Sequence, residues 1–288
     1  MRARLQRAYP DLTVELLGMT TEGDRKLGTT LAKIGGKGLF VKELEEALLE
    51  GRADLAVHSM KDVPVNLPEG FTLAAIGERE DPLDAFVSGK YASVADLPHG
   101  ARVGTASLRR ESQLRARRPD LDVQPVRGNV QTRLRKLDEG EYDAIILACA
   151  GLRRLGLGDR IRSAIPAEDS LPAVGQGALG IECRSDREDV HRLVSILGDA
   201  DTAWCVRAER AMSRALAGSC TVPLGGFAQI SAGQAVLRGF VSTPDGKRLE
   251  RARAESPVAG VAPEALGQRV ADQLLSAGAA EILAVANA

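Results

Sequence analysis

Residues 101–148 read ARVGTASLRR ESQLRARRPD LDVQPVRGNV QTRLRKLDEG EYDAIILA, and this stretch decides the fold class. Its short apolar runs predict strands at 101–105, 121–126 and 143–148, and the stretches between them predict helices at 107–118 and 129–138. Strands separated by single helices of this length are typical of parallel sheets with right-handed crossovers. We therefore expect an α/β unit here.

The chain before this stretch also alternates between helix and strand. We predict a helix at 40–50 that ends at Gly51, and strands at 12–17, 53–57 and 71–76. The charged segment EREDP (78–82) ends in proline and is a candidate hinge. A strand predicted at 178–183 returns to this first block, which is thus a second α/β unit.

The character of the sequence changes after Gly198. We predict a helix at 202–216, a glycine-rich loop, a β-meander over 227–242 turning at 244–246, and a final helix at 263–277. This order is typical of an α+β unit. The sequence thus predicts three domains, namely 1–77 together with 178–197, then 83–172, then 198–288.

The composition limits the classes of function. Of the 288 residues 44% are hydrophobic and 27% charged, which is ordinary for a soluble globular protein, and the formal net charge is −1. Aromatic residues make up 3%, which argues against a surface that stacks nucleic-acid bases. The chain has no apolar stretch of membrane-spanning length, and its start, MRARLQRAYPDL, lacks the apolar core of a signal peptide. We expect a cytoplasmic protein that binds neither nucleic acid nor membrane.

The four cysteines form no C-x-x-C pair, and the three histidines are scattered. This spacing suits neither a zinc site nor a disulfide framework, so we expect no metal. Three of the thiols lie in apolar or helical stretches and are interpreted as buried structural residues, namely Cys149, Cys183 and Cys205. Cys220 lies in the loop GSCTVPLG (218–225), after a helix rich in arginine, and is the candidate for chemistry.

Positive charge concentrates between residues 101 and 136, which hold ten basic and three acidic side chains. Arg109 and Arg110 follow GTAS at a strand-to-helix turn, where backbone N–H groups favour anions. Arg127 stands at the next such turn, with Arg133 one helical turn further. Such turns share one edge of a parallel sheet, so we expect a ligand with several carboxylates.

Two further segments carry candidate functional groups. Asp62, in HSMKDVP (58–64), follows a predicted buried strand, where catalytic groups collect in α/β folds, although an aspartate at a turn often only caps a backbone N–H. Near Lys61 and several arginines we expect it to stay ionised. The loop GGKG (35–38) lacks the Walker spacing, so we interpret it as a mobile loop that carries Lys33 and Lys37 near the cleft.

Together these motifs are similar to those of the porphobilinogen deaminase (hydroxymethylbilane synthase) family along essentially the whole chain. The matching stretches are LAKIGGKGLFVKE (31–43), AVHSMKDVP (56–64), GTASLRRESQ (104–113), RGNVQTRL (127–134), VGQG (174–177) and GSCTVPLG (218–225). The resemblance implies two α/β domains like those of periplasmic binding proteins, with the active site between them, plus a smaller C-terminal α+β domain. It also implies a monomer that condenses four porphobilinogen molecules into hydroxymethylbilane, with release of ammonia, in haem and porphyrin biosynthesis.

The resemblance further implies a role for individual residues. Cys220 would hold a dipyrromethane cofactor through a thioether, and Asp62 would be the catalytic carboxylate that stabilises the azafulvene-type cation left when ammonia departs. The cofactor would also be bound by Ser59, Lys61, Thr105, Ser107, Arg109, Arg110 and Arg127. The substrate and the growing chain would contact Lys33, Lys37, Phe40, Arg133 and Arg154.

The sequence departs from the family pattern at its start. Family members begin with a strand and a turn that carry cofactor-binding Arg and Ser residues, and residues 1–9 match the end of the helix that follows them. We expect the true start to lie upstream, and we expect poor stability and activity of the 288-residue form.

Two other classes of function stay open from the residues alone. A non-catalytic carboxylate-binding protein would also use two α/β domains and an arginine-lined cleft, but it leaves the loop thiol Cys220 and the third domain unexplained. A nucleic-acid-binding protein rests only on the basic stretch at 101–136.

Overall fold

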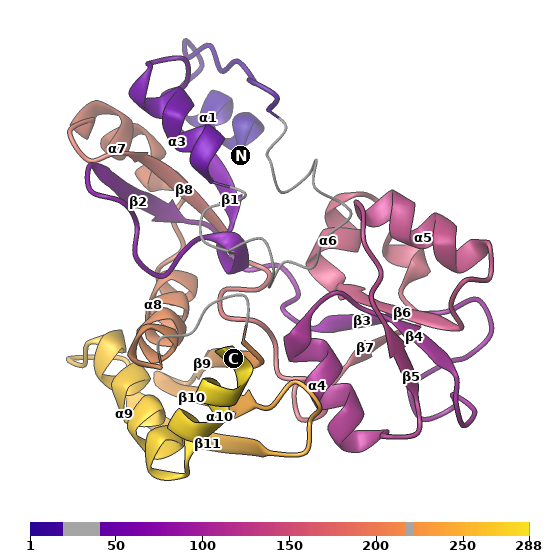
Figure 1. Cartoon of the computed structure of the whole chain (residues 1–288). Coiled ribbons are helices and arrows are strands. Elements are labelled where there is room, and N and C mark those ends of the chain that lie inside the picture. Colours follow the sequence, from indigo (N-terminus) through magenta and orange to yellow (C-terminus); the bar gives the residue numbers. More distant parts are fainter. Residues whose placement is uncertain (20–40, 217–221, 288) are drawn as a thin grey trace.

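A computed structural model describes residues 1–19, 41–216 and 222–287 of the chain. Its strands form three sheets, with the strand orders β1-β8-β2, β5-β4-β6-β3-β7 and β11-β10-β9. The three sheets lie in separate parts of the molecule, and connecting segments run through the region between them (Figure 1). No helix within the described ranges combines the length and apolarity needed to cross a lipid bilayer.

The first sheet and its helices are built from two separate stretches of the chain, the N-terminal part up to Ile76 and residues 179–197. Its elements are α1 (Arg2–Ala8), α3 (Lys42–Leu49), β1 (Ala56–Ser59), the 3-10 turn η2 (Met60–Asp62), β2 (Phe71–Ile76), β8 (Leu179–Arg184), α7 (Glu188–Val194) and the 3-10 turn η4 (Ser195–Leu197). Strand β8 lies between β1 and β2 and is antiparallel to both. One face of β8 packs Ile181 and Cys183 against Leu5 of α1 and Val194 of α7.

The second sheet carries helices on both faces. Its elements are β3 (Asp84–Val87), β4 (Arg102–Gly104), α4 (Leu108–Arg117), β5 (Asp122–Gln124), α5 (Val130–Asp138), β6 (Ala144–Ala148), α6 (Cys149–Arg154), the 3-10 turn η3 (Gly158–Arg160) and β7 (Ser163–Ile165). Val103 and Ile146 face Leu114 of α4, whereas Ile145 faces Leu134 of α5 on the other side. Successive residues of β6 thus point to opposite faces, and both faces are buried.

The third sheet is an antiparallel meander covered by helices. Its elements are α8 (Ala200–Ala215), β9 (Leu224–Ser231), β10 (Gln234–Ser242), β11 (Leu249–Pro257), α9 (Pro263–Ser276) and α10 (Ala279–Asn287). Leu237 of β10, Met212 of α8 and Leu274 of α9 share one core. Helix α8 also contacts β2, so it links the first and third sheets (Figure 1).

The α/β and α+β fold class is confirmed, and most predicted elements form within a few residues of their expected bounds. Gly51 follows α3 with a φ of 68°, as a helix-ending glycine should. The division into three domains stays a prediction.

The strand predicted at 12–17 does not form. A strand needs a neighbour for its backbone hydrogen bonds, and this segment pairs with none of the described strands. The side chains of Leu16 and Leu17 are 74% and 53% exposed, so the apolar pattern did not lead to burial.

The three strands predicted in the second sheet are parallel, as expected, and two further strands join the sheet. Strand β4 is parallel to β5 and β6, but β3 is antiparallel to its neighbours β6 and β7. Neither β3 nor β7 was predicted, because each is short, and β3 joins the sheet through partners far along the chain. The sequence also did not indicate β11 and α10.

Candidate active site

Asp62 lies in a turn whose flanking residues are anchored in the core. Met60 and Val63 are buried in one cluster, so the turn η2 places Lys61 and Asp62 on its outer side. The N–H of Met60 donates to the carbonyl of Ala178, at 3.0 Å, which ties the turn to the strand entering the first sheet. Asp62 is exposed to solvent, as a group that acts on a ligand must be.

The surroundings of Asp62 move its pKa in opposite directions. The protein around the carboxyl group displaces bulk water and raises its pKa, while Lys61, His58, Arg110 and Arg133 act against this rise. The pKa of Asp62 is raised on balance, so burial outweighs the nearby cations, and the expectation that Asp62 stays ionised remains a prediction. Burial also lowers the pKa of Lys61, and the charge of Asp62 opposes that fall.

A second group of cations extends from the second sheet toward Asp62. Helix α5 starts at Asn129, whose side chain accepts the N–H of Thr132 at 2.8 Å, and Arg133 on its first turn donates from Nε to the carbonyl of Gly128 at 2.7 Å. Burial and, to a smaller extent, the charges of Arg110 and Arg127 lower the pKa of Arg133 to about 10, while Asp62 acts against this fall. The structure thus brings Arg110 and Arg133 near Asp62, and Arg127 near Arg133.

The hydroxyl residues predicted for the site lie on both sides of it. Thr105 is buried just after β4, and its Oγ1 accepts the N–H of Ser107 at 3.2 Å. Ser107 is the N-cap of α4, but its side chain does not cap the helix. Ser59 is half-buried at the end of β1, two residues before Lys61.

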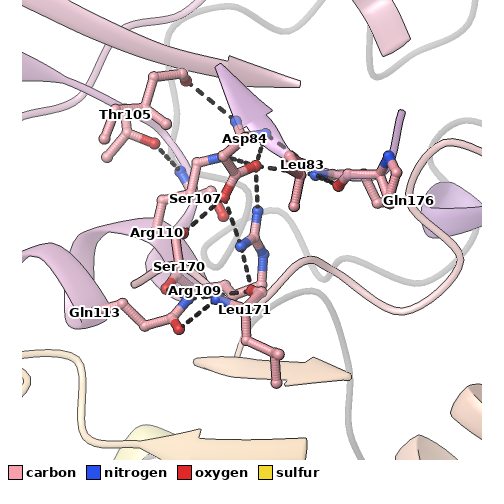
Figure 2. A network of polar contacts seen from close by, with 12 residues as sticks. Leu83, Asp84, Thr105, Ser107, Arg109, Arg110, Gln113, Ser170, Leu171 and Gln176 are labelled. Carbon is pink, nitrogen blue, oxygen red and sulfur yellow. Dashed lines mark hydrogen bonds and ion pairs between the residues drawn. The ribbon is translucent and has the colours of Figure 1, made fainter. Parts of the chain in front are cut away.

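Arg109 and Arg110 already share a carboxylate partner within the chain. Arg109 donates from Nη1 to Oδ2 of Asp84 at 2.8 Å and from Nη2 to Oδ1 at 3.0 Å, and Arg110 donates from Nε to Oδ1 at 2.9 Å (Figure 2). Ser170 and Gln176 complete this network with bonds of 2.8 and 3.0 Å to the same carboxylate. The network is buried, and the two guanidinium groups hold the pKa of Asp84 well below its usual range.

This network corrects the expectation for the arginine pair. The fork formed by Arg109 and Arg110 was expected to bind ligand carboxylates, whereas its first carboxylate is the buried Asp84. Sequence reasoning interpreted only EREDP (78–82), as a candidate hinge, and assigned no role to Asp84 two residues further on. A signal was available: an aspartate in the apolar run LDAFV must find a cationic partner when buried.

Arg154, at the end of α6, lies next to the connection between the first two sheets. It is exposed, and its Nη2 donates to the carbonyl of Gly177 at 2.6 Å. Burial of part of the side chain lowers the pKa of Arg154, and the charge of Glu80 raises it. The predicted substrate-binding residue thus contacts the connecting segment.

Four predicted site residues lie outside the described residues, namely Lys33, Lys37, Phe40 and Cys220. The described end of α8 nevertheless lies close to the segment that follows Asp62. Arg210 donates to the carbonyls of Val63 and Pro64 at 3.1 and 2.6 Å, and Arg214 donates to the side chain of Asn66 at 2.9 Å. In the sequence, Cys220 follows the C-cap Leu216 by four residues.

The other three cysteines are buried and free of disulfides, as predicted. Burial raises the pKa of Cys149 and of Cys205 to about 12, and it also raises the pKa of Cys183. These thiols are poor nucleophiles at neutral pH. Among the described residues there is no cluster of three or more His, Cys, Asp or Glu side chains that could hold a metal ion.

Comparison of the backbone with solved structures gives only loose matches. One is the periplasmic aliphatic sulphonate binding protein SsuA from Escherichia coli, which is 16% identical and covers 74% of this chain and 64% of its own, with a TM-score of 0.39. A match at this level supports no statement about a ligand.

Comparison at the level of sequence is decisive. The family model described as porphobilinogen deaminase, dipyromethane cofactor binding domain, matches residues 1–192, and the model of the C-terminal domain matches residues 203–276. The porphobilinogen deaminase of Laribacter hongkongensis is 62% identical over 98% of this chain and 91% of its own length. That of Nitrosomonas europaea is 62% identical over 99% of this chain and 92% of its own. The chain therefore belongs to the porphobilinogen deaminase family.

Proposed function

We propose that this chain carries out the family's reaction, the head-to-tail condensation of four porphobilinogen molecules into hydroxymethylbilane. Each addition breaks the carbon–nitrogen bond of an aminomethyl group, releases ammonia and forms a carbon–carbon bond to the next pyrrole, which loses a proton. The observation that carries the proposal is that the charges of Lys61, Arg110 and Arg133 act on the exposed carboxylate of Asp62, with Arg127 next to Arg133. The relatives named above favour this reaction over a non-catalytic carboxylate-binding protein.

The described residues fit a dipyrromethane, whose acetate and propionate groups are carboxylates. After burial, the charges of Arg110 and Arg127 are the next causes that lower the pKa of Arg133, so positive charges lie close together here. Ligand carboxylates would relieve that repulsion and form charge-assisted hydrogen bonds. When bound through Cys220, the dipyrromethane supplies the pyrrole carbon that accepts the first unit.

Asp62 is the proposed catalytic carboxylate. Its place outside the turn lets it accept pyrrole N–H groups, and in its ionised form it stabilises the cation that the substrate becomes when ammonia leaves. Lys61 beside it balances the negative charge before substrate binds.

The arginines divide into two proposed roles. Arg110 and Arg133, whose charges act on Asp62, and Arg127, whose charge acts on Arg133, bind carboxylates of the cofactor and the growing chain. Arg109 donates three bonds to Asp84 and the carbonyl of Leu171, so beside its proposed cofactor contact it holds α4 in place.

The remaining predicted contacts are kept as proposals. Cofactor contacts are assigned to Ser59, Thr105 and Ser107, and substrate contacts to Lys33, Lys37, Phe40 and Arg154. We also propose that the protein is a cytoplasmic monomer with domains 1–77 plus 178–197, 83–172 and 198–288.

The intact mass of the purified full chain tests this function, measured beside a Cys220→Ser variant. We expect an added mass of two pyrrole units on the chain that is absent from the variant. Cys205→Ser, which changes a buried thiol, is the matched control and should keep the added mass. Equal unmodified masses for the full chain and Cys220→Ser would contradict the proposal.

A further inference from the structure

Residues 175–178 (GQGA), here named the bridging segment, lie against the turn that carries Asp62. The carbonyl of Ala178 accepts the N–H of Met60 at 3.0 Å. Gly175, with a φ of 73°, lies so close that a Cβ there would be 2.8 Å from Cβ of Met60. Only glycine combines this backbone conformation with this approach, so one end of the segment is packed tightly against the Met60–Asp62 turn.

The side chain of Gln176 connects the same segment to the arginine network (Figure 2). Its Nε2 donates to the carbonyl of Pro82 at 2.7 Å and to Oδ1 of Asp84 at 3.0 Å, and its Oε1 accepts from Nη2 of Arg110 at 3.4 Å. The side chain is 1% exposed. An amide is required for this pattern, because it donates to one charged partner and accepts from the other.

The backbone of the bridging segment is held from the third sheet as well. Glu209 of α8 accepts the N–H of Gly175 at 2.7 Å, and Arg79 donates from Nε to the carbonyl of Gln176 at 2.8 Å. Arg79 and Glu209 are themselves joined by a buried ion pair of 2.6 Å. The segment is therefore fixed at three sides and has little freedom to shift between them.

We propose that the bridging segment sets the distance between Asp62 and the guanidinium of Arg110, with Gln176 as the positioning residue. Asp62 follows a strand of the first sheet, and Arg110 lies on a helix that covers the second. The bridging segment contacts both places, because Ala178 accepts the N–H of Met60 in the Asp62 turn and Gln176 accepts from Arg110. The inference rests on the proposed function, in which these two groups act on one ligand. It assigns a task to the motif VGQG, which the resemblance left without a role.

An exchange of charge between positions 84 and 176 tests the bridge. Gln176→Glu places two carboxylates about 3 Å apart, the separation now spanned by the bond from Nε2 to Asp84, and removes a donor. Asp84→Asn leaves Arg109 and Arg110 without their counterion. The double variant Asp84→Asn/Gln176→Glu returns one carboxylate and one amide to the network in exchanged places.

The readout is hydrogen–deuterium exchange of the backbone at residues 56–66 in the full chain, without substrate. We expect each single variant to exchange there on the order of tenfold faster, and the double variant to exchange more slowly than either. Gln176→Leu, which has no charge and no polar side-chain atom, should also accelerate exchange, and it serves if a charged variant does not fold. Unchanged exchange at 56–66 in Gln176→Leu and Gln176→Glu would overturn the bridge.

Turnover against pH gives a readout that a purely structural role would not move. In Gln176→Glu one of the two adjacent carboxyl groups takes up a proton as the pH falls, and the protonated group can again donate. The charged groups that face it are Asp84 on β3, Arg109 and Arg110 on α4, Arg79 before β3 and Glu209 on α8. Turnover of Gln176→Glu relative to the unsubstituted chain should therefore rise as the pH is lowered, and a constant ratio would count against the bridge.

Asp81→Asn is the matched control, because Asp81 pairs with Arg153 of α6 and accepts the N–H of Leu83, but it has no bond to Asp84, Arg110 or Gln176. It should leave exchange at 56–66 within about twofold of the unsubstituted chain. Coupled exchange without an added mass on Cys220 would support the bridge and contradict the proposed function. An added mass on Cys220 together with unchanged exchange at 56–66 in the Gln176 variants would support the proposed function and contradict the bridge.

Discussion

Asp62 and Asp84 are two aspartates whose surroundings move their pKa values apart. The guanidinium groups of Arg109 and Arg110 hold the pKa of Asp84 far below its usual range. Asp84 therefore stays ionised and acts as their fixed counterion. Asp62 has a raised pKa and access to solvent, so its charge responds to pH and to a ligand. Such a division between a structural and a reactive carboxylate is typical of catalytic sites.

Replacement of Asp62 tests the role assigned to it. Asp62→Asn should lower kcat by on the order of 10² to 10³, because a neutral amide cannot stabilise the developing cation. The cofactor mass should persist, since Cys220 is unchanged. Asp54→Asn, an exposed aspartate paired with Arg187 in the same part of the molecule, is the control. Near-normal turnover of Asp62→Asn would remove Asp62 from the chemistry.

The raised pKa of Asp62 also predicts the acid side of the pH–rate profile. The ionised form is the active one, so kcat/KM should fall as the pH drops through the raised pKa. The fall should therefore begin above about pH 3.9, the ordinary value for an aspartate. Circular dichroism at each pH separates this loss from unfolding. A profile that stays flat down to that value would contradict the assignment.

At the scale of elements, the first turns of α4 and α5 place the cations. Arg109 and Arg110 lie on the first turn of α4, and Arg133 lies on the first turn of α5. The start of α5 is fixed by its cap Asn129, which holds the N–H of Thr132. The position at which each helix starts therefore determines where the backbone presents these arginine side chains.

Removal of that cap should be measurable. Asn129→Ala should lower the free energy of unfolding by about 1 kcal/mol, the usual cost of a lost N-cap. Gln131→Ala, on the exposed side of the same turn, should change it by less than about 0.5 kcal/mol. Urea unfolding measures both. Equal values for the two variants would mean that the cap does not hold the helix.

The sequence predicted elements with a local signal and missed those that depend on distant partners. Alternating apolar runs were enough for β2, which forms at the predicted residues, and for α4 and α5. Strand β3 forms because it pairs with β6 and β7 on either side. These partners are about 60 and 80 residues further along the chain, so no local pattern reveals them. Likewise, the sequence indicated that Arg109 and Arg110 bind carboxylates, but it did not indicate their ion pairs with Asp84.

At the scale of the whole molecule, buried ion pairs join segments that the sequence separates widely. Arg79, between the first two sheets, pairs with Glu209 of α8, whose carboxylate also accepts the N–H of Ala228 at 2.8 Å. The ring of Phe227 lies 5.0 Å from the guanidinium carbon of Arg79. The third sheet is thereby fixed to the connection between the other two.

The Arg79–Glu209 pair should contribute to stability far more than a surface pair. Glu209→Gln leaves a buried cation without its partner and should cost about 3 to 5 kcal/mol in urea unfolding. Glu264→Gln breaks the exposed pair with Arg207 and should cost less than about 1 kcal/mol. A similar cost for both variants would contradict the placement of Glu209 at the centre of the assembly.

The most direct test of the account is the intact mass of the full chain after brief incubation with limiting porphobilinogen. If the growing chain stays bound through Cys220 while Asp62 and the arginines act on each new unit, the spectrum should show a ladder above the cofactor-bearing mass. Each step should equal one porphobilinogen less one ammonia. A single mass that does not change while porphobilinogen is consumed would contradict growth on the protein.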